Sequence, residues 1–296
     1  MGYIGEHSML DAAPVIPLIR RIIKSSYKRL SKKGEVMDKI VADDSDGVTN
    51  IFAPVFDNDP DLAVTATKLT AMAKEHQFQS IQNYELNGMI FDKYGKKYFK
   101  NHGFASSDVV QMAMQLAAYR LFGNKQVGTY EAALTRTFLH GRTETIRPVS
   151  FESNAFIECM ENDDCVREEK IAALRRACSA HAEYVADASQ GQGVDRHLLG
   201  LESMIRPQDK HVPTLFSDPV FQRAKHWRLS TSTVIFCPGF GPSTDDGIGV
   251  GYLIGSDSCQ FTFTSFAKNH HVDTFAKLLE EALTEIGDLF DNQDRE

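Results

Sequence analysis

The first residues that could carry out chemistry lie near the start of the sequence, in the stretch GYIGEHSMLDAAP. His7 and Asp11 are four residues apart, so a helix beginning near residue 7 would place both side chains on one face. A carboxylate in that position can fix the tautomer of the imidazole and stabilise its charged form, as a general base requires. The pair is therefore a candidate base with its orienting acid, although the spacing by itself is a weak signal.

Hydroxyl side chains fill the stretch LSTST, residues 229–233. If this stretch is a strand, Ser230 and Ser232 point to one face and Thr231 points to the other. Two hydroxyls on one face can donate hydrogen bonds to a developing oxyanion. The alternative is an ordinary edge strand rich in serine and threonine.

Basic side chains cluster in KYGKKYFKNH, residues 93–102, within a chain whose net charge is −8. Such a cluster in an acidic protein can hold a small anionic cofactor, and the alternative is a solvated, lysine-rich loop. Arg142 and Arg147 flank Thr143, and Arg196 lies in DRHLLGL. An arginine fork suits a carboxylate partner, whereas surface salt bridges are the alternative for each arginine.

Helices and strands alternate along the chain, which predicts an α/β fold. Ser106, Ser107 and Asp108 are candidate N-caps of one helix, and Gly123 is its stop signal. The Gly-rich segment PGFGPSTDDGIG matches no nucleotide-binding motif. Helices are predicted at residues 14–30, 61–79, 109–123, 166–190, 195–205, 221–227 and 272–290, and strands at 80–91, 229–236, 247–255 and 259–266.

Composition narrows the class of protein. The chain has 296 residues, of which 42% are hydrophobic and 24% charged, as in a globular protein with one large or two ordinary domains. No apolar run approaches the roughly 18 residues of a membrane span, so membrane contact is expected to be peripheral. The net charge of −8 disfavours binding to nucleic acid.

Five cysteines occur without CxxC or Cys/His spacing, which argues against structural zinc. We expect them to be buried free thiols in a reducing compartment. The first residues contain neither an apolar signal core nor an Arg-rich targeting stretch, so no targeting signal can be read from this sequence. The cysteines are Cys159, Cys165, Cys178, Cys237 and Cys259.

Six motifs follow one another in a fixed order: EHSMLDA, GKKYFK, TYEAALTRTFLHGRTETIRP, GQGVDRHLLGL, LSTST and FGPSTDDGIGVGY. This ordered set closely resembles the choline/carnitine acyltransferase family. Within the family, HGRTETIRP, LSTST and the GFGP loop look most like the carnitine palmitoyltransferases. The resemblance runs from residue 2 to about residue 290 and covers the C-terminal half of a family member.

The resemblance implies the CoA-dependent acyltransferase fold, which is similar to chloramphenicol acetyltransferase and has a mixed β-sheet flanked by helices. Family members have two related domains of this kind, with the active site in a tunnel between them. Residues 1–60 match the end of the N-terminal domain, including the catalytic histidine segment. Residues 61–296 match the C-terminal domain, which binds CoA and carnitine. The first half of the family's length is then expected to be missing from this chain.

Roles in catalysis carry over by position. His7 matches the catalytic base, and Asp11 matches its orienting carboxylate, which in the family also meets the arginine at Arg142. Ser232 matches the hydroxyl that stabilises the oxyanion, and Ser230 lies beside it. The reaction implied is reversible acyl transfer between CoA and the carnitine hydroxyl, without an acyl-enzyme.

Roles in binding carry over in the same way. Tyr130, Thr143 and Arg196 match residues that bind the carnitine carboxylate, and Phe240 matches an aromatic ring beside the trimethylammonium group. Choline has no carboxylate, so Arg196 and Thr143 favour carnitine. Within the basic cluster of residues 93–102, Lys96 and Lys100 match lysines that bind the phosphates of CoA.

Three positions depart from the family. Ala132 replaces a serine found near carnitine in acetyl-preferring relatives, and Ser107 replaces an acid that contacts CoA in some members. Pro238 precedes Gly239 where long-chain enzymes have glycines, and the loop favours long or medium acyl chains over acetyl.

The resemblance predicts a carnitine O-acyltransferase of class EC 2.3.1, with no permanently bound cofactor and with acyl-CoA as co-substrate. The alternative is a truncated, non-catalytic member that binds CoA, carnitine or a full-length relative. Another acyltransferase of this fold, acting on a different alcohol, is a third reading. Mitochondrial localisation follows from the resemblance, and the cytoplasm or peroxisome is the alternative. Association with the missing N-terminal half is also expected.

Overall fold

The computed structural model describes residues 15, 17–22, 24, 25, 60–209, 211–233 and 239–291. The chain divides into two compact units, Met1–Ser80 and Ile81–Glu296. The described residues between 15 and 25 are helical, and helix α3 spans Pro60–Gln82, as the sequence predicts for both stretches. The assignment of two family domains with a boundary near residue 60 stays a prediction.

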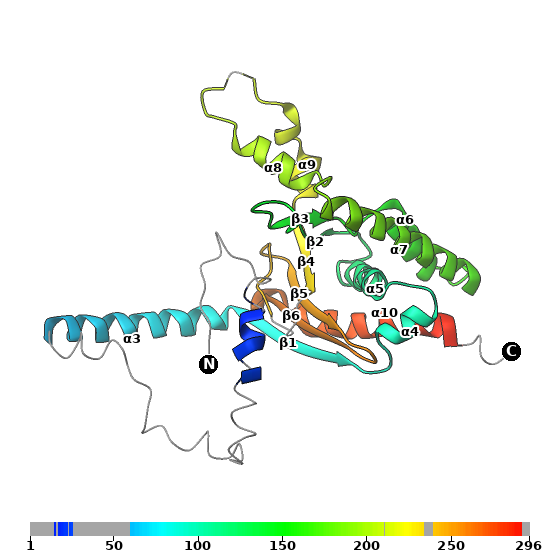
Figure 1. Ribbon diagram of the computed structural model, residues 1–296, viewed down its shortest axis with the longest axis horizontal. Helices are drawn as coiled ribbons and strands as arrows, with labels where there is room; N and C mark the ends of the chain where they lie inside the picture. The colour runs from blue at the N-terminus through cyan, green and yellow to red at the C-terminus, as the bar shows by residue number, and fades with distance from the viewer. Residues whose placement is uncertain are drawn as a thin grey trace, which may run out of the picture. The chain divides into compact units, whose positions relative to one another are not determined.

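A mixed β-sheet forms the centre of the second unit (Figure 1). Within the described residues it has six strands in the order β1-β6-β5-β4-β2-β3. Strands β2, β4 and β5 run parallel, and the other pairs are antiparallel. The strands are β1 (Tyr84–Phe91), β2 (Gly128–Leu134), β3 (Thr143–Ile146), β4 (Trp227–Thr233), β5 (Ile248–Ile254) and β6 (Cys259–Phe266).

Helices flank this sheet, and Figure 1 shows α5, α7 and α10 gathered on the same side of it. The predicted α/β class, a mixed sheet flanked by helices, is confirmed. The helices of this unit are α4 (Lys96–Asn101), α5 (Ser106–Leu121), α6 (Phe151–Met160), α7 (Arg167–Ser189), α8 (Asp195–Ser203), α9 (Pro219–Ala224) and α10 (Val272–Asp291), with 3-10 turns η2 (Thr214–Ser217) and η3 (Ala267–Asn269).

The core lies between the sheet and these helices. Phe261 and Phe263 alternate with half-buried or hydroxyl residues along β6, so their rings enter the core on one face. Helix α5 is buried almost all round because it contacts α6, α7 and α10. The apolar side of α10, including Phe275 and Leu279, packs into the same cluster.

The predicted cap of α5 is wrong. The N-cap is Ala105, whose side chain accepts no hydrogen bond, and Ser106 is the first helical residue. Asp108 does not cap because its carboxylate bonds His181 in the core. The predicted stop is confirmed, since Gly123 has a φ of +72°, which glycine adopts without the steric cost that a side chain would add.

Two other predicted boundaries differ from the structure. Residues 80–82 end helix α3, and strand β1 begins only at Tyr84. Helix α9 begins earlier than predicted because Asp218 accepts hydrogen bonds from Val220 N and Phe221 N and Pro219 fits the first turn. It ends at Ala224, and Trp227 already belongs to β4.

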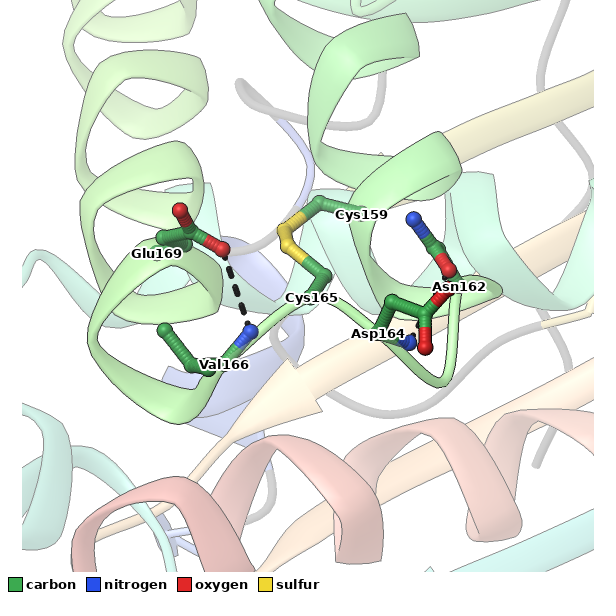
Figure 2. Close-up of a disulfide and its surroundings, with 6 residues drawn as sticks. All are labelled: Cys159, Asn162, Asp164, Cys165, Val166 and Glu169. Atoms are coloured by element: carbon green, nitrogen blue, oxygen red, sulfur yellow. Dashed lines mark hydrogen bonds between the residues drawn. A yellow bond between two sulfur atoms is a disulfide. The ribbon is translucent and has the colours of Figure 1, made fainter.

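The expectation of free thiols is wrong for one pair of cysteines. Cys159 and Cys165 form a disulfide, with their Cα atoms 5.6 Å apart (Figure 2). A turn at Asn162 brings them together: its carbonyl accepts from Cys165 N at 3.1 Å, and its side chain accepts from Asp164 N at 3.0 Å. Sequence spacing carries no sign of such a turn. The expectation is confirmed for the buried thiols of Cys178 and Cys259, and Cys237 lies outside the described residues.

None of the helices in the described ranges is both long enough and apolar enough to cross a bilayer.

Candidate functional site

The serines of β4 lie on the same face of the sheet as Tyr130 of β2. Tyr130 pairs with Ser230, and Thr231 lies between Ser230 and Ser232 with its side chain buried on the opposite face. Residues paired across neighbouring strands share a face, so the prediction that both serines point the same way is confirmed. The alternative of an edge strand is wrong, because β4 lies between β2 and β5.

Small and hydroxyl-bearing residues continue this face across the sheet. Ser230 pairs with Gly249 and Ser232 pairs with Gly251 on β5. These glycines pair in turn with Thr264 and Thr262 on β6. A surface of glycine, serine and threonine lets a ligand come close to the backbone while hydroxyls remain within reach. We call this surface, formed by Tyr130, Ser230, Ser232, Gly249, Gly251, Thr262 and Thr264, the hydroxyl face.

The loop that carries Phe240 passes over the hydroxyl face. A Cβ atom on Gly249 would lie 2.5 Å from the carbonyl oxygen of Phe240, so only glycine fits there. A Cβ atom on Gly239 would lie 3.4 Å from Thr264 Oγ1. The structure therefore brings the backbone of Phe240 next to β5, the strand that flanks Ser230, and the predicted role of its ring stays a prediction.

Arg196 at the start of α8 reaches the same face. Its guanidinium donates one hydrogen bond to the Tyr130 hydroxyl at 3.2 Å and another to Thr145 Oγ1 at 3.2 Å. Its carbon Cζ lies 5.8 Å from the centre of the Tyr130 ring. Two of the residues predicted to bind a carboxylate, Tyr130 and Arg196, are thus in contact, although 66 residues separate them.

Thr143, the third predicted carboxylate ligand, lies on β3. Leu134 pairs with Thr143 and Ala132 pairs with Thr145, which places both threonines on the face of Tyr130. Two residues along a strand span about 7 Å. Thr143 therefore lies about 7 Å along β3 from Thr145, and it is Thr145 that contacts Arg196.

Two acidic residues hold the start of α8 in place. Glu144 accepts hydrogen bonds from Thr145 N at 2.6 Å and from Arg196 N at 3.2 Å, and its side chain is buried. Arg147 grips Asp195 with two hydrogen bonds of 2.6 and 2.8 Å. A carboxylate that accepts from the first amides of a helix stabilises its positive end. The backbone that carries Arg196 is fixed at this point.

Sequence reasoning missed Glu144 and Thr145 as site residues. The signal was present in TETI, where a strand must bury every second residue, and an acid at such a position needs donors from its surroundings. Gly193 is a second signal, because a Cβ atom there would collide with Glu144 Cγ. Arg147 forms a salt bridge with Asp195, which is partly buried rather than at the surface as the salt-bridge interpretation had it.

The predicted CoA lysines lie elsewhere, on α4 at the end of β5. Lys96 N donates to the carbonyl of Gly255 at 2.9 Å, which places α4 beyond the carboxyl end of that strand. Lys97 pairs with Asp257, and Lys93 donates to Thr284. The exposed ammonium groups of Lys96 and Lys100 form no ion pair with other described residues. No contact links these lysines to the residues around Arg196 within the ranges that the structure covers.

The predicted base and its acid, His7 and Asp11, lie outside the described residues. Arg142 lies at the end of a turn, where its carbonyl accepts from Thr135 N at 3.1 Å. The meeting of Arg142 with Asp11 stays a prediction.

Two of the three departures from the family can be located. Ala132 is half-buried on the Tyr130 face of β2. Ser107 is exposed, and its hydroxyl bonds Asp108 at 3.3 Å. Pro238 lies outside the described residues. As for metals, the described part of the chain contains no group of three or more His, Cys, Asp or Glu residues able to hold an ion.

Comparisons with known proteins identify relatives of this chain. The family model described as "Choline/Carnitine o-acyltransferase" matches residues 1–281. The mitochondrial carnitine O-acetyltransferase of Saccharomyces cerevisiae is 30% identical over 99% of this chain and 44% of its own length. The carnitine O-acetyltransferase of Columba livia is 32% identical over 97% of this chain and 45% of its own.

A further relative is the peroxisomal carnitine O-octanoyltransferase of Bos taurus, 36% identical over 62% of this chain and 31% of its own length. Among solved structures, chloramphenicol acetyltransferase matches with 13% identity and a TM-score of 0.35 over 68% of this chain and 88% of that one. The chain spans less than half the length of these carnitine acyltransferases. The match to the family model, which extends over almost the whole chain, shows that it belongs to the choline/carnitine O-acyltransferase family.

Proposed function

We propose that this chain is a carnitine O-acyltransferase that transfers a fatty acyl group reversibly between CoA and carnitine. The observation that carries the proposal is the contact of Arg196 with the Tyr130 hydroxyl, beside a face that carries Ser230 and Ser232. A guanidinium next to a phenol suits a carboxylate, and serine hydroxyls suit an oxyanion. The two requirements of the reaction thus meet on one face of the sheet.

Carnitine would bind with its carboxylate at Arg196, Tyr130 and Thr143. Its trimethylammonium group would lie against the ring of Phe240, because the face of an aromatic ring attracts cations. Thr145 keeps the guanidinium of Arg196 oriented through its hydroxyl. This places the carnitine hydroxyl toward β4.

His7 is proposed as the general base, with Asp11 holding its imidazole and Arg142 holding Asp11. The imidazole takes the proton of the carnitine hydroxyl while the oxygen attacks the thioester carbonyl of acyl-CoA. Ser232 donates a hydrogen bond to the resulting oxyanion, with Ser230 beside it. The intermediate collapses, the carbon–sulfur bond breaks, and the imidazolium returns its proton to the CoA sulfur.

CoA would bind through its phosphates at Lys96 and Lys100. Both lysines are exposed on α4. The acidic side chain of Asp257 pairs with Lys97 rather than with either of them. Charge neutralisation by two lysines accounts for phosphate binding, and it should weaken as ionic strength rises.

Carnitine rather than choline is the proposed acceptor, and Arg196→Asn tests it. Removing the guanidinium should raise KM for carnitine roughly 10- to 100-fold, as expected for loss of a hydrogen bond to a charged group. KM for acyl-CoA should stay within about twofold. Arg206→Asn is the matched control, because Arg206 is exposed in the turn after α8. Equal loss of choline and carnitine binding would contradict the assignment.

A medium or long acyl chain is proposed, as in the palmitoyltransferases, on the strength of the GFGP loop. The relatives described above act on acetyl and octanoyl groups according to their names, which sets the competing expectation. Comparing kcat/KM for acetyl-, octanoyl- and palmitoyl-CoA decides the matter. A preference for acetyl-CoA would overturn this part of the proposal.

The proposed activity is tested by supplying acyl-CoA and carnitine to the chain and measuring free CoA thiol. Thiol release that requires carnitine supports the enzyme. The chain spans less than half of its relatives' length, so the same assay should be repeated with the N-terminal half of a family member added. Binding of CoA and carnitine without thiol release in either assay would favour a non-catalytic binding protein.

Mitochondrial localisation is proposed from the name of the yeast relative, while the bovine relative is peroxisomal. Imaging a tagged full-length gene product against markers of both organelles tests the proposal. Peroxisomal or cytoplasmic signal would contradict it.

A further inference from the structure

Charged side chains are buried beneath the hydroxyl face, on the core side of the sheet. His181 of α7 lies 2.9 Å from Asp108 of α5 through Nδ1 and 2.8 Å from Glu131 of β2 through Nε2. These side chains are almost completely buried. Burial by itself would lower the pKa of His181, but the hydrogen bonds to Asp108 and Glu131 outweigh it and raise that pKa to about 9. At neutral pH the ring is an imidazolium that donates from both nitrogens.

Hydrogen bonds extend from this cluster to strand β4. The Tyr252 hydroxyl donates to Glu131 at 3.0 Å, and the Gln111 amide donates to Tyr252 at 3.2 Å. The same amide group donates to Thr231 Oγ1 at 3.0 Å, and Thr231 Oγ1 donates to the carbonyl of Tyr130 at 3.0 Å. Every donor in this chain of bonds has a distinct hydrogen to give. The network therefore joins α5, α7, β2, β4 and β5.

The ends of the network lie directly behind the candidate site. Glu131 follows Tyr130 in β2, and Thr231 separates Ser230 from Ser232 in β4. Side chains alternate between faces, so the network holds one side of the backbone while the site residues project from the other. The Thr231 bond to the carbonyl of Tyr130 crosses between the two strands at this point.

We propose that this buried network, formed by Asp108, Gln111, Glu131, His181, Thr231 and Tyr252, is a positioning device that sets β2 against β4. It fixes the distance between two parts of the candidate site. One part is Tyr130 with Arg196, and the other is Ser230 with Ser232. The inference rests on the proposed function, in which the first pair binds the carboxylate and the serines serve the oxyanion. A catalytic arrangement must be held to about half an ångström, and a shift of 1 Å can cost about 100-fold in rate.

A role in stability alone would not require this design. Apolar residues of similar volume often stabilise a core as well as a buried ion pair does. A polar network instead restrains its members to one geometry, because each bond has a direction. In this network Gln111 Oε1 is buried without a hydrogen-bond partner among the described residues, while its amide nitrogen bonds both Thr231 and Tyr252. In this chain the directed bonds end on the two strands that carry the site.

Thr231→Val tests the proposal, and Thr129→Val is its matched control. Both threonines are buried on the core face, and both changes replace a hydroxyl with a methyl group. Thr129 bonds Gln115 and the carbonyl of Val127, so its hydroxyl does not reach Tyr130 or β4. The first measurement is amide hydrogen exchange in residues 128–134 and 227–233. The second is kcat and KM for carnitine and for acyl-CoA.

Thr231→Val should speed exchange at β2 and β4 roughly tenfold or more over the Thr129→Val control. It should lower kcat/KM for carnitine roughly tenfold while KM for acyl-CoA stays within about twofold. Equal exchange and equal kinetics in the two variants would overturn the inference. If the wild-type chain transfers no acyl group, either alone or with the N-terminal half of a family member added, the proposed function fails, and the exchange comparison still decides whether the network positions the strands.

Discussion

The two faces of the sheet differ in chemistry although the same strands build both. One face carries hydroxyls and glycines, such as Ser230, Ser232 and Gly249. The other carries Phe261 and Phe263 together with the buried charges around His181. Strand alternation assigns neighbouring residues to opposite faces, so each of these strands contributes to the hydroxyl face and to the core at once.

This difference shows how a face of small, hydroxyl-bearing residues can be combined with an ordered backbone. Small residues on the hydroxyl face bury little apolar area and contribute little to stability. The opposite face supplies both the apolar burial and the directed hydrogen bonds that hold the backbone. We therefore expect changes on the core face to alter folding, and changes on the hydroxyl face to alter binding and catalysis.

The largest expected effect comes from Phe263→Ala on the core face. Phe263 is fully buried in β6 and lies 5.7 Å from the ring of Phe275 in α10. Removing the ring leaves a cavity and should lower the free energy of unfolding by about 4 kcal/mol. Urea unfolding followed by circular dichroism measures this loss. A loss below about 1 kcal/mol would show that the two faces of the sheet contribute alike to the free energy of unfolding.

The next effect is the response of stability to pH through His181. Its pKa of about 9 lies above the ordinary value of 6.5, so the folded chain binds this proton more tightly than the unfolded chain does. The stabilisation is complete below about pH 6.5 and is lost as the pH rises through 9, by about 3 kcal/mol in all.

Unfolding in urea at pH 6, 8 and 10 measures this response, with His181→Asn as the comparison. The charged partners of the ring are Asp108 and Glu131, while burial raises the pKa of Cys178 and of Tyr252, which keeps both neutral. The variant should show a smaller fall in stability between pH 8 and 10, because the raised pKa values of Cys178, Cys259 and Tyr252 also lower stability as the unfolded thiols and phenol ionise in this range. An equal fall in stability in both proteins would mean that groups other than His181 cause it.

A third prediction distinguishes the two faces of the sheet by their effect on catalysis. Ser232→Ala should lower kcat about 100-fold, as for loss of one oxyanion donor, and should leave the unfolding midpoint nearly unchanged. Ser265→Ala is the matched control, because Ser265 is a buried serine on β6 whose hydroxyl bonds the carbonyl of Phe266. It should leave kcat within about twofold. Equal kcat values in the two variants would remove Ser232 from the mechanism.

The smallest effect concerns Thr264 on the hydroxyl face. Its Oγ1 is buried and has no hydrogen-bond partner among the residues that the structure describes. Thr264→Val keeps the shape and removes an unsatisfied polar atom, so it should raise the free energy of unfolding by up to about 1 kcal/mol. Differential scanning calorimetry measures the change. A lower melting temperature would show that the hydroxyl already contributes to the folded chain.

Long, strongly patterned elements could be predicted from the sequence. Helices α5, α7 and α10 and strands β4, β5 and β6 lie where the apolar periodicity indicates them. The shared face of Ser230 and Ser232 follows from strand alternation alone, and the register confirms it. The resemblance to the family assigns Tyr130 and Arg196 to the same ligand group, and the structure brings the two side chains into contact.

Other features depended on contacts between distant segments. The Cys159–Cys165 disulfide needs the turn at Asn162, and no spacing rule gives that turn. Asp108 looked like a helix cap because such residues often cap, but a buried imidazole 73 residues away offers it a stronger partner. Local preference was overridden by a tertiary contact.

The sequence by itself determined the family, the α/β class and the shared face of Ser230 and Ser232, because motif order and side-chain periodicity are properties of the chain. Only the tertiary structure decided that Glu144 anchors Arg196 and that His181 links Asp108 to Glu131. Buried charges must find partners wherever the fold provides them. Those partners come from elements far apart in sequence, and their pairing is settled when the elements pack.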